Sequence, residues 1–218
     1  MTAGSKGAPL IAGWRREPHR VLELIVVALV LKEPSGRMGA QIRAAEPTDA
    51  EALHALTADA LDEPPAQSPL RWWKSQLERS GGPRWLVLEH AGAVIGCVSC
   101  RTRESSHGLP ERGHVAVLAV HRQWRRQGYG TRLMHAAIDL LEVETPFPCI
   151  SLFVRADNHA ALQLYGRLGF QRHARVPGYY HGGDDAALLV RWRDAPVPAP
   201  APVDAPARER ARRTTLVA

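Results

Sequence analysis

Residues that could bind phosphate are concentrated in one short run, Arg-Arg-Gln-Gly-Tyr-Gly, from Arg125 to Gly130. The run follows an apolar stretch typical of a strand and precedes a stretch with helical periodicity. Glycine lets a backbone turn approach a ligand closely, and the free N–H groups of a first helical turn attract an anion. The two arginines add positive charge. The run therefore predicts a pyrophosphate-binding turn, although it lacks the third glycine of the dinucleotide-binding fingerprint and the Gly-Lys-Ser/Thr of a P-loop.

The elements that must position this turn follow from the pattern of apolar residues along the chain. Strands are predicted over residues 42–45, 85–89, 94–101, 114–120, 150–155 and 186–192, with a hairpin turn at Ala91-Gly92. Helices are predicted after a capping box at Thr48-Asp49-Ala50-Glu51 and over residues 70–77, 130–143 and 158–168, with Gly169 as the final cap. A hairpin followed by strand–helix–strand–helix–strand predicts one mixed α/β domain over residues 38–193.

Both ends of the chain differ from this domain. Residues 1–37 hold an apolar run from Val21 to Leu31, broken by Glu23, which is shorter than the roughly 20 residues that a membrane-spanning helix needs. No signal-peptide cleavage pattern follows it. We expect an N-terminal extension, packed on the domain or poorly ordered, with Met38 as an alternative start and no membrane partner. Residues 194–218 are rich in Pro and Ala and are predicted to form a disordered tail.

Composition narrows the classes of function. The 218 residues are 45% hydrophobic and 23% charged, which suits one domain with its own core. The net charge of +6 suits an anionic partner, but arginine is spread along the chain rather than gathered in one patch, so nucleic-acid binding is not favoured. Three cysteines favour a reducing, cytoplasmic setting. Cys97 and Cys100 would lie on opposite faces of a strand and no His spacing suits zinc, so no metal site is predicted.

Three motifs in this order resemble the GNAT acetyltransferase superfamily. The run from Arg125 to Gly130 is similar to its acetyl-CoA-binding motif, Arg/Gln-x-x-Gly-x-Gly/Ala. The superfamily's opening segment is resembled here by Ile42-Arg43-x-Ala45 with Asp49. Its closing strand–helix segment is resembled by Asn158-x-x-Ala161-x-x-x-Tyr165-x-x-x-Gly169-Phe170. The pattern is closest to ribosomal-protein-alanine and protein N-terminal acetyltransferases. The resemblance implies a GNAT fold, which is a mixed central sheet with flanking helices and a splayed pair of parallel strands, here residues 114–120 and 150–155.

The resemblance implies acetyl-CoA as the co-substrate, and no metal. Backbone groups of Leu118, Ala119 and Val120 would hold the pantetheine arm like an added strand, with Asn158 bonding its side. The Val120 amide is the expected donor to the developing oxyanion. The pyrophosphate would lie against the turn, whose expected contacts are Arg125, Arg126, Gln127, Gly128, Tyr129, Gly130 and Thr131.

Catalytic residues are implied in the same way. Tyr165 matches the superfamily's usual acid; without the motif it would be interpreted as a core-facing aromatic residue of an amphipathic helix. The usual base, a Glu on the strand before the closing helix, is replaced by Phe153, which cannot take a proton. His114 is the best replacement, with an unperturbed pKa of about 6.5, and the alternative is an exposed His at a strand end. Glu104 and Glu111 are weaker candidates in a predicted loop.

The acceptor side is predicted from the segment Val176-Pro177-Gly178-Tyr179-Tyr180, which resembles a loop of protein N-terminal acetyltransferases in which paired tyrosines line the peptide groove. Tyr179 and Tyr180 are therefore expected to bind substrate, and the alternative is packing within a hairpin loop. Trp72 is expected to face the cleft, with Trp73 in the core.

The predicted function is acetyl transfer to a primary amine, with a protein or peptide N-terminus as the acceptor. Two alternatives stay open. One is a small amine or an aminoglycoside as the acceptor, and the other is a non-catalytic acetyl-CoA sensor, which the loss of the usual base at Phe153 would allow. The oligomeric state stays open as well.

Overall fold

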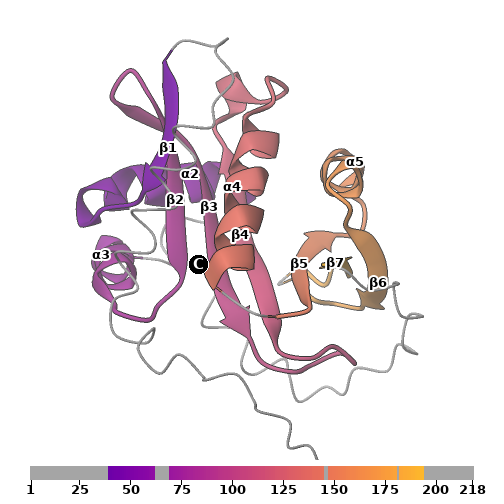
Figure 1. Ribbon diagram of the computed structural model, residues 1–218. Helices are drawn as coiled ribbons and strands as arrows, with labels where there is room; N and C mark the ends of the chain where they lie inside the picture. Colours follow the sequence, from indigo (N-terminus) through magenta and orange to yellow (C-terminus); the bar gives the residue numbers. More distant parts are fainter. Residues whose placement is uncertain (1–38, 62–68, 145–146, 181, 194–218) are drawn as a thin grey trace, which may run out of the picture.

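Among the described residues, seven strands form one sheet, which is the frame of the computed structural model (Figure 1). The structure describes residues 39–61, 69–144, 147–180 and 182–193; the predicted N-terminal extension and C-terminal tail lie outside them. The strands are β1 (Ala40–Ala44), β2 (Arg84–His90), β3 (Ala93–Arg103), β4 (Arg112–Val120), β5 (Cys149–Arg155), β6 (Gln171–Val176) and β7 (Ala186–Trp192). Their spatial order is β1-β2-β3-β4-β5-β7-β6, and neighbours are antiparallel except β4 and β5. The predicted mixed α/β class is confirmed.

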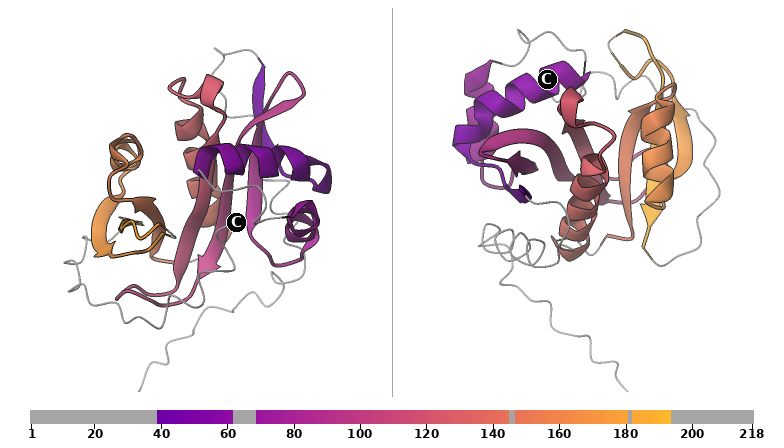
Figure 2. Two further views of the ribbon diagram at one scale, coloured as in Figure 1. Left: turned by 180° about the vertical axis from the view of Figure 1, so that it is seen from behind. Right: turned by 90° about the horizontal axis from the view of Figure 1, so that it is seen from above.

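Helices cover both faces of the sheet (Figure 2). They are α2 (Ala50–Leu61), α3 (Leu70–Glu78), α4 (Tyr129–Glu144) and α5 (His159–Arg167), with short 3-10 turns at Pro47–Asp49 and Arg122–Trp124. The α4 face of the sheet holds a core that includes Leu133 and Val115, and the α2/α3 face holds one that includes Leu53 and Trp73. Within the described residues, no helix is both long enough and apolar enough to cross a membrane.

The two strand cysteines test the expected alternation of side chains. Cys97 packs in the core on the α2/α3 face and Cys100 packs in the core on the α4 face, so the prediction that they point to opposite sides is confirmed. Both are free and buried. Burial raises the pKa of the Cys97 thiol to about 12, so this group stays protonated and unreactive.

Two local predictions were wrong. The capping box at the start of the first helix is formed by Glu46 and Asp49, not by Thr48 and Glu51, because Pro47 starts a 3-10 turn ahead of α2. The strand β6 was missed because most of its residues, Gln-Arg-His-Ala-Arg-Val, are polar and show no apolar alternation. It is an edge strand that pairs only with β7 in the sheet order, which explains why it tolerates exposed charges.

The parallel strands β4 and β5 diverge after a short contact. Their pairing covers only Gly113 to Val115 on β4, opposite Ile150 to Leu152 on β5. On its other side β4 has a bulge, because Ser99 pairs with Val117 and the next residue of β3 pairs with Val115, which leaves Ala116 without a partner. The bulge bends β4 away from β5, and the predicted splayed pair of parallel strands is confirmed.

Candidate active site

The glycine-rich turn at the start of α4 has the geometry of an anion site. Gly128 has φ +86° and Arg126 has φ +65°, so both lie in the left-handed region. The amide of Arg132 donates to the Gly128 carbonyl at 3.1 Å, and the three residues before Arg132 therefore have no intrahelical acceptor for their N–H groups. A Cβ built on Gly128 would meet no atom within 4 Å. The turn is thus open on the side where these amides and the helix dipole attract an anion.

The charged and amide side chains of this turn are exposed, and two of them also hold the turn in place. The Arg125 Nε atom donates to the Val120 carbonyl at 2.9 Å, and its guanidinium lies 3.5 Å from the Asp59 carboxylate, so Arg125 ties the turn to β4 and α2. Gln127 donates to the backbone carbonyl of Gln123 at 3.1 Å. Arg125, Arg126 and Gln127 are all exposed. Both arginines predicted to meet phosphate therefore keep their charge at the surface, and Arg125 also ties the turn in place.

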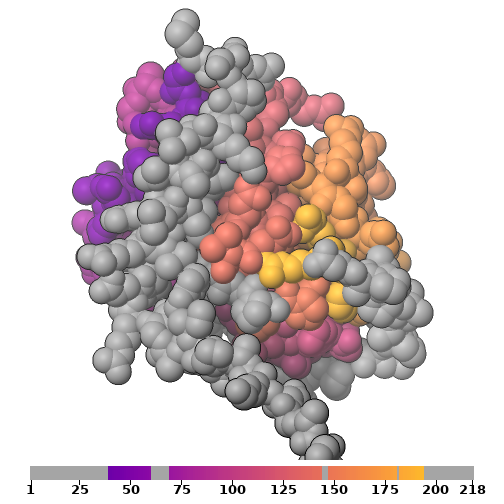
Figure 3. All heavy atoms as spheres, viewed as in Figure 1, coloured from indigo at the N-terminus to yellow at the C-terminus, as the bar shows by residue number. Residues whose placement is uncertain are grey.

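The turn adjoins the end of β4 and a cavity between two helices. Leu118, Ala119 and Val120 are beyond the last β4–β5 pair, and their register partners all belong to β3. A cavity of about 320 Å³ opens between α4 and α5; its lining includes Thr131, just after the turn, and Leu164 on α5. Figure 3 shows the surfaces of these two helices facing each other with atoms of β7 between them. The turn thus adjoins the end of β4 on one side and, on the other, a cavity whose lining comes from α4, α5 and Arg191 of β7.

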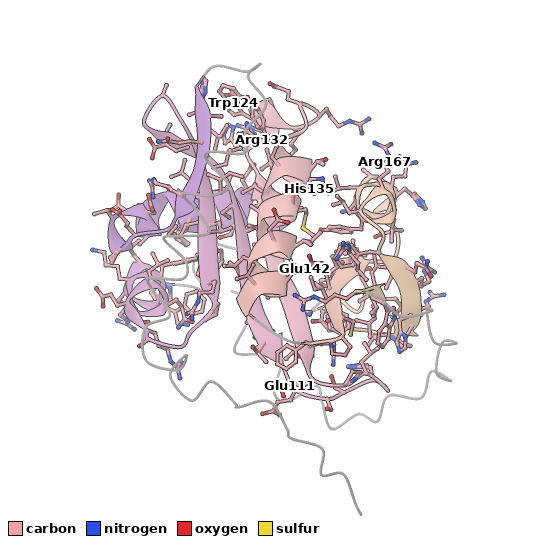
Figure 4. All side chains as sticks on the ribbon, viewed as in Figure 1. Glu111, Trp124, Arg132, His135, Glu142 and Arg167 are labelled. Carbon is pink, nitrogen blue, oxygen red and sulfur yellow. The ribbon has the colours of Figure 1, made fainter. Side chains whose placement is uncertain are left out.

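Side chains from three elements line this cleft. His135 on α4 lies on the side toward α5, and Arg167 projects from α5 (Figure 4). Arg191 on β7 forms an ion pair with Glu142 on α4 and so joins helix and sheet. The cleft therefore presents both cationic and acidic groups, the latter from Asp139 and Glu142, beside apolar side chains.

Two predicted site residues belong to α5. Asn158 is its N-cap, and its Oδ1 atom accepts from the Ala161 amide at 3.0 Å. Tyr165 is 8% exposed and packs edge-to-face with Phe170 at a centroid distance of 6.0 Å. Burial raises the pKa of Tyr165 to about 12, so the hydroxyl keeps its proton across the neutral range. The two interpretations of Tyr165 are therefore compatible, since it is a core residue that also retains a transferable proton.

His114 is buried, so the alternative interpretation of an exposed His at a strand end was wrong. Its side chain is 3% exposed, and its Nδ1 atom lies 2.9 Å from the Ser151 Oγ atom. Burial, with the charges of Arg103, Arg101 and Arg112, holds its pKa well below the usual 6.5. The imidazole is consequently neutral at physiological pH, not titrating near neutrality as the sequence suggested.

The partner of His114 is fixed by a buried arginine. Arg112 is fully buried, and its Nε atom donates to the Ser151 hydroxyl at 2.9 Å. Its other nitrogens donate to the carbonyls of Glu104 and Pro110 and to the Ser106 hydroxyl. Arg112 thereby fixes the segment between β3 and β4 and orients Ser151 toward His114.

Aromatic rings connect His114 to the predicted acceptor loop. Phe153 lies 5.7 Å from the His114 ring and stacks on Tyr179 at 4.4 Å with an interplanar angle of 19°. Tyr179 contacts Tyr180 edge-to-face at 5.0 Å. Burial raises the pKa of Tyr180, and the nearby hydroxyls of Tyr179 and then Tyr165 add to this effect. The structure thus brings His114, the tyrosine loop and Tyr165 to one region.

The remaining predicted residues lie elsewhere. Trp72 is half-buried and packs edge-to-face on Trp73 at 5.2 Å, against the core of the α2/α3 face, while Trp73 is a core residue as predicted. Glu104 and Glu111 are exposed, and Glu111 lies at the lower end of the molecule in Figure 4. His114 remains the better placed of the candidate bases, because its ring packs against Phe153, which stacks on Tyr179 of the acceptor loop.

Comparison with known proteins identifies the family. Residues 49–170 match the sequence model described as the Acetyltransferase (GNAT) family. The chain belongs to this family. An N-alpha-acetyltransferase from Sulfurisphaera tokodaii is 30% identical over 69% of this chain and 91% of its own length. N-alpha-acetyltransferase 30 from Schizosaccharomyces pombe is 37% identical over 44% of this chain, and the match spans 63% of the relative's length.

A solved GNAT structure supports the same assignment. The ribosomal-protein-S18-alanine N-acetyltransferase from Escherichia coli has a TM-score of 0.57 and 25% identity, over 70% of this chain and 93% of that chain. The GNAT fold predicted from the sequence is confirmed.

Some residues of this GNAT site were missed by sequence analysis. Arg101, Arg112 and Ser151 all act on His114, through charge or a hydrogen bond. Their placement depends on strand register, since Arg101 pairs with His114 and His114 pairs with Ser151. The alternating Arg-Thr-Arg from Arg101 to Arg103 was the available signal, because alternate strand residues share a face.

Proposed function

We propose that this GNAT protein is an acetyl-CoA-dependent N-acetyltransferase that acts on the α-amine of a protein or peptide N-terminus. The observation that carries the proposal is the juxtaposition of an open anion-binding turn, a β4 edge that diverges from β5, and a polar–aromatic region that holds His114 and Tyr165. Two compared proteins support the acceptor, since their names describe N-alpha-acetyltransferases.

The residues present fit acetyl-CoA. The amides from Arg126 to Thr131 would hold its pyrophosphate, because the turn is open and its helical N–H groups lack intrahelical acceptors. Backbone groups of Leu118, Ala119 and Val120 would hold the pantetheine arm at the edge that β5 has left. Asn158 would bond the arm through its amide nitrogen, since its oxygen caps α5. When bound, acetyl-CoA supplies an acetyl group activated as a thioester.

The protein's own residues would move two protons. His114 is neutral, and a proton on its Nδ1 atom donated to Ser151 leaves the Nε2 atom free to accept one from the acceptor ammonium, directly or through water. The depressed pKa makes His114 a weak base that remains available at low pH. Tyr165 keeps its proton and would give it to the departing sulfur. The Val120 amide would stabilise negative charge on the carbonyl oxygen.

The charges near His114 disfavour a cationic small-molecule acceptor. Arg101 and Arg103 both act on His114 from the same sheet face, so a polycationic aminoglycoside would be repelled there. The non-catalytic sensor has one specific observation in its favour, because Phe153 fills the position of the family's usual base and stacks on Tyr179.

The location is a separate proposal. The three cysteines are free and buried, which agrees with a reducing compartment. We place the protein in the cytoplasm on this ground, and compartment-specific proteomics would test it.

One experiment separates these functions. The full chain is incubated with acetyl-CoA and a peptide array, beside a panel of small amines and aminoglycosides, and free CoA is measured. Acetylated peptide α-amines support the proposal, and activity confined to small amines refutes the acceptor. CoA binding without turnover on any acceptor would favour the sensor.

A further inference from the structure

Two arginines of β3 lie on the same sheet face as His114. Arg101 is the register partner of His114, which is itself the partner of Ser151, so the three side chains project from one face. Arg103 is two residues further along β3 and therefore shares this face. Its guanidinium carbon lies 5.1 Å from the centre of the Phe153 ring, which stacks on Tyr179. The acceptor loop and both guanidinium groups thus border the same region.

Arg101 lacks a partner for a buried donor. Its Nε atom is buried and makes no hydrogen bond, and the side chain as a whole is half-buried. The titratable groups that act on it are Arg103, which repels it, and the Tyr179 hydroxyl; no carboxylate of the described residues is among them. A buried unpaired donor beside a like charge is unfavourable, and a bound anion would relieve both effects.

We infer that Arg101 and Arg103 select acceptor peptides with an acidic side chain close to the N-terminus. The inference rests on the proposed function and names its substrate class. A planar guanidinium binds a carboxylate through two parallel N–H donors, which fits the unpaired donor of Arg101.

Strand geometry places the acidic residue. Arg101 is level with His114, and Arg103 lies about 7 Å further along the strand, because alternate strand residues are that far apart. An extended peptide advances about 3.3 Å per residue, so a step from Arg101 to Arg103 corresponds to two acceptor residues. With the α-amine near His114, the carboxylate belongs to the second or third residue.

The test compares matched peptides with the full chain. Peptides that begin Ala-Asp-Asp, Ala-Asn-Asn and Ala-Lys-Lys and are otherwise identical are acetylated with acetyl-CoA, and kcat/KM is measured. We expect the Asp peptide to exceed the Asn peptide by about tenfold or more, and the Lys peptide to be slowest. Arg101→Met and Arg103→Met should each reduce the Asp-to-Asn ratio. Free aspartate and glutamate are assayed in parallel.

The control is Arg172→Gln, which removes the same charge from an exposed position on β6. The register partner of Arg172, Leu189, packs in the core on the α4 face, so Arg172 projects away from His114. This variant should keep the Asp-to-Asn ratio. If Arg101→Met fails to fold, Arg103→Met and the wild-type peptide series still decide.

Several outcomes would overturn the inference. Equal kcat/KM for the Asp and Asn peptides, an unchanged ratio in both arginine variants, or faster acetylation of free aspartate than of the peptide would each do so. Failure of the proposed function looks different, since then no peptide is acetylated. In that case the affinity of the same peptides is measured by calorimetry in the presence of CoA. The acidic peptides should still bind more tightly than their Asn counterparts, and equal affinities would overturn the inference.

Discussion

Replacing Gly128 by Ala should separate coenzyme binding from folding. Gly128 has φ +86°, a left-handed conformation that costs an L-residue about 1–2 kcal/mol. The added Cβ would meet no protein atom within 4 Å, so the folded chain has no clash to relieve beyond this strain. The methyl group would instead occupy the space in front of the amides proposed to hold the pyrophosphate. We expect a melting temperature lower by a few degrees and a loss of CoA affinity of about tenfold or more.

The chain offers a matched control for this change. Gly92, in the turn between β2 and β3, has φ +78° and likewise no atom within 4 Å of a built Cβ. Gly92→Ala should therefore show a similar loss of stability with unchanged CoA affinity. Thermal unfolding and isothermal titration calorimetry with CoA measure the two effects separately. Equal CoA affinity in both variants would show that the turn at Gly128 does not hold the diphosphate.

Three further predictions concern buried polar groups. The pKa of His114 in the native protein lies below its unfolded value of about 6.5, so below that pH the unfolded chain binds a proton that the native protein does not. The free energy of unfolding should therefore fall as the pH drops below about 6.5, by up to about 1.4 kcal/mol per pH unit. Urea unfolding of His114→Gln should show a weaker acid loss, and equal losses would contradict this. Tyr165→Phe should lower kcat and spare CoA affinity, and full turnover would exclude its role as acid. Arg112→Met should lower the free energy of unfolding by about 3 kcal/mol or more, because it leaves the partners of four hydrogen bonds unsatisfied; a loss under about 1 kcal/mol would refute this.

Local sequence patterns predicted most of the elements and missed those with weak patterns. The hairpin around Ala91-Gly92, the helix over residues 70–78 and the final strand were predicted because their apolar residues recur at helix or strand spacing. β6 was missed because an edge strand can carry charged residues on its exposed positions. The capping box was displaced by two residues because Pro47 allowed an extra 3-10 turn.

The candidate site likewise combines features that local sequence predicted with features that it did not. The turn from Arg125 to Gly130 was predicted by local residue types, and its open geometry agrees with that prediction. The protonation state of His114 was not predicted, because its neutral form depends on burial and on arginines that the sheet register places beside it. Its hydrogen-bond partner, Ser151, is 37 residues away in the sequence.

The sequence by itself determined the order of the elements, the glycine turn and the resemblance to GNAT acetyltransferases, since these depend on neighbouring residues and on periodicity. The tertiary structure decided where β4 leaves β5, which charges surround His114, and that the Arg103 guanidinium lies over Phe153. The physical reason is that strand register and burial join residues far apart in the chain, and the pKa of a buried group depends on those neighbours.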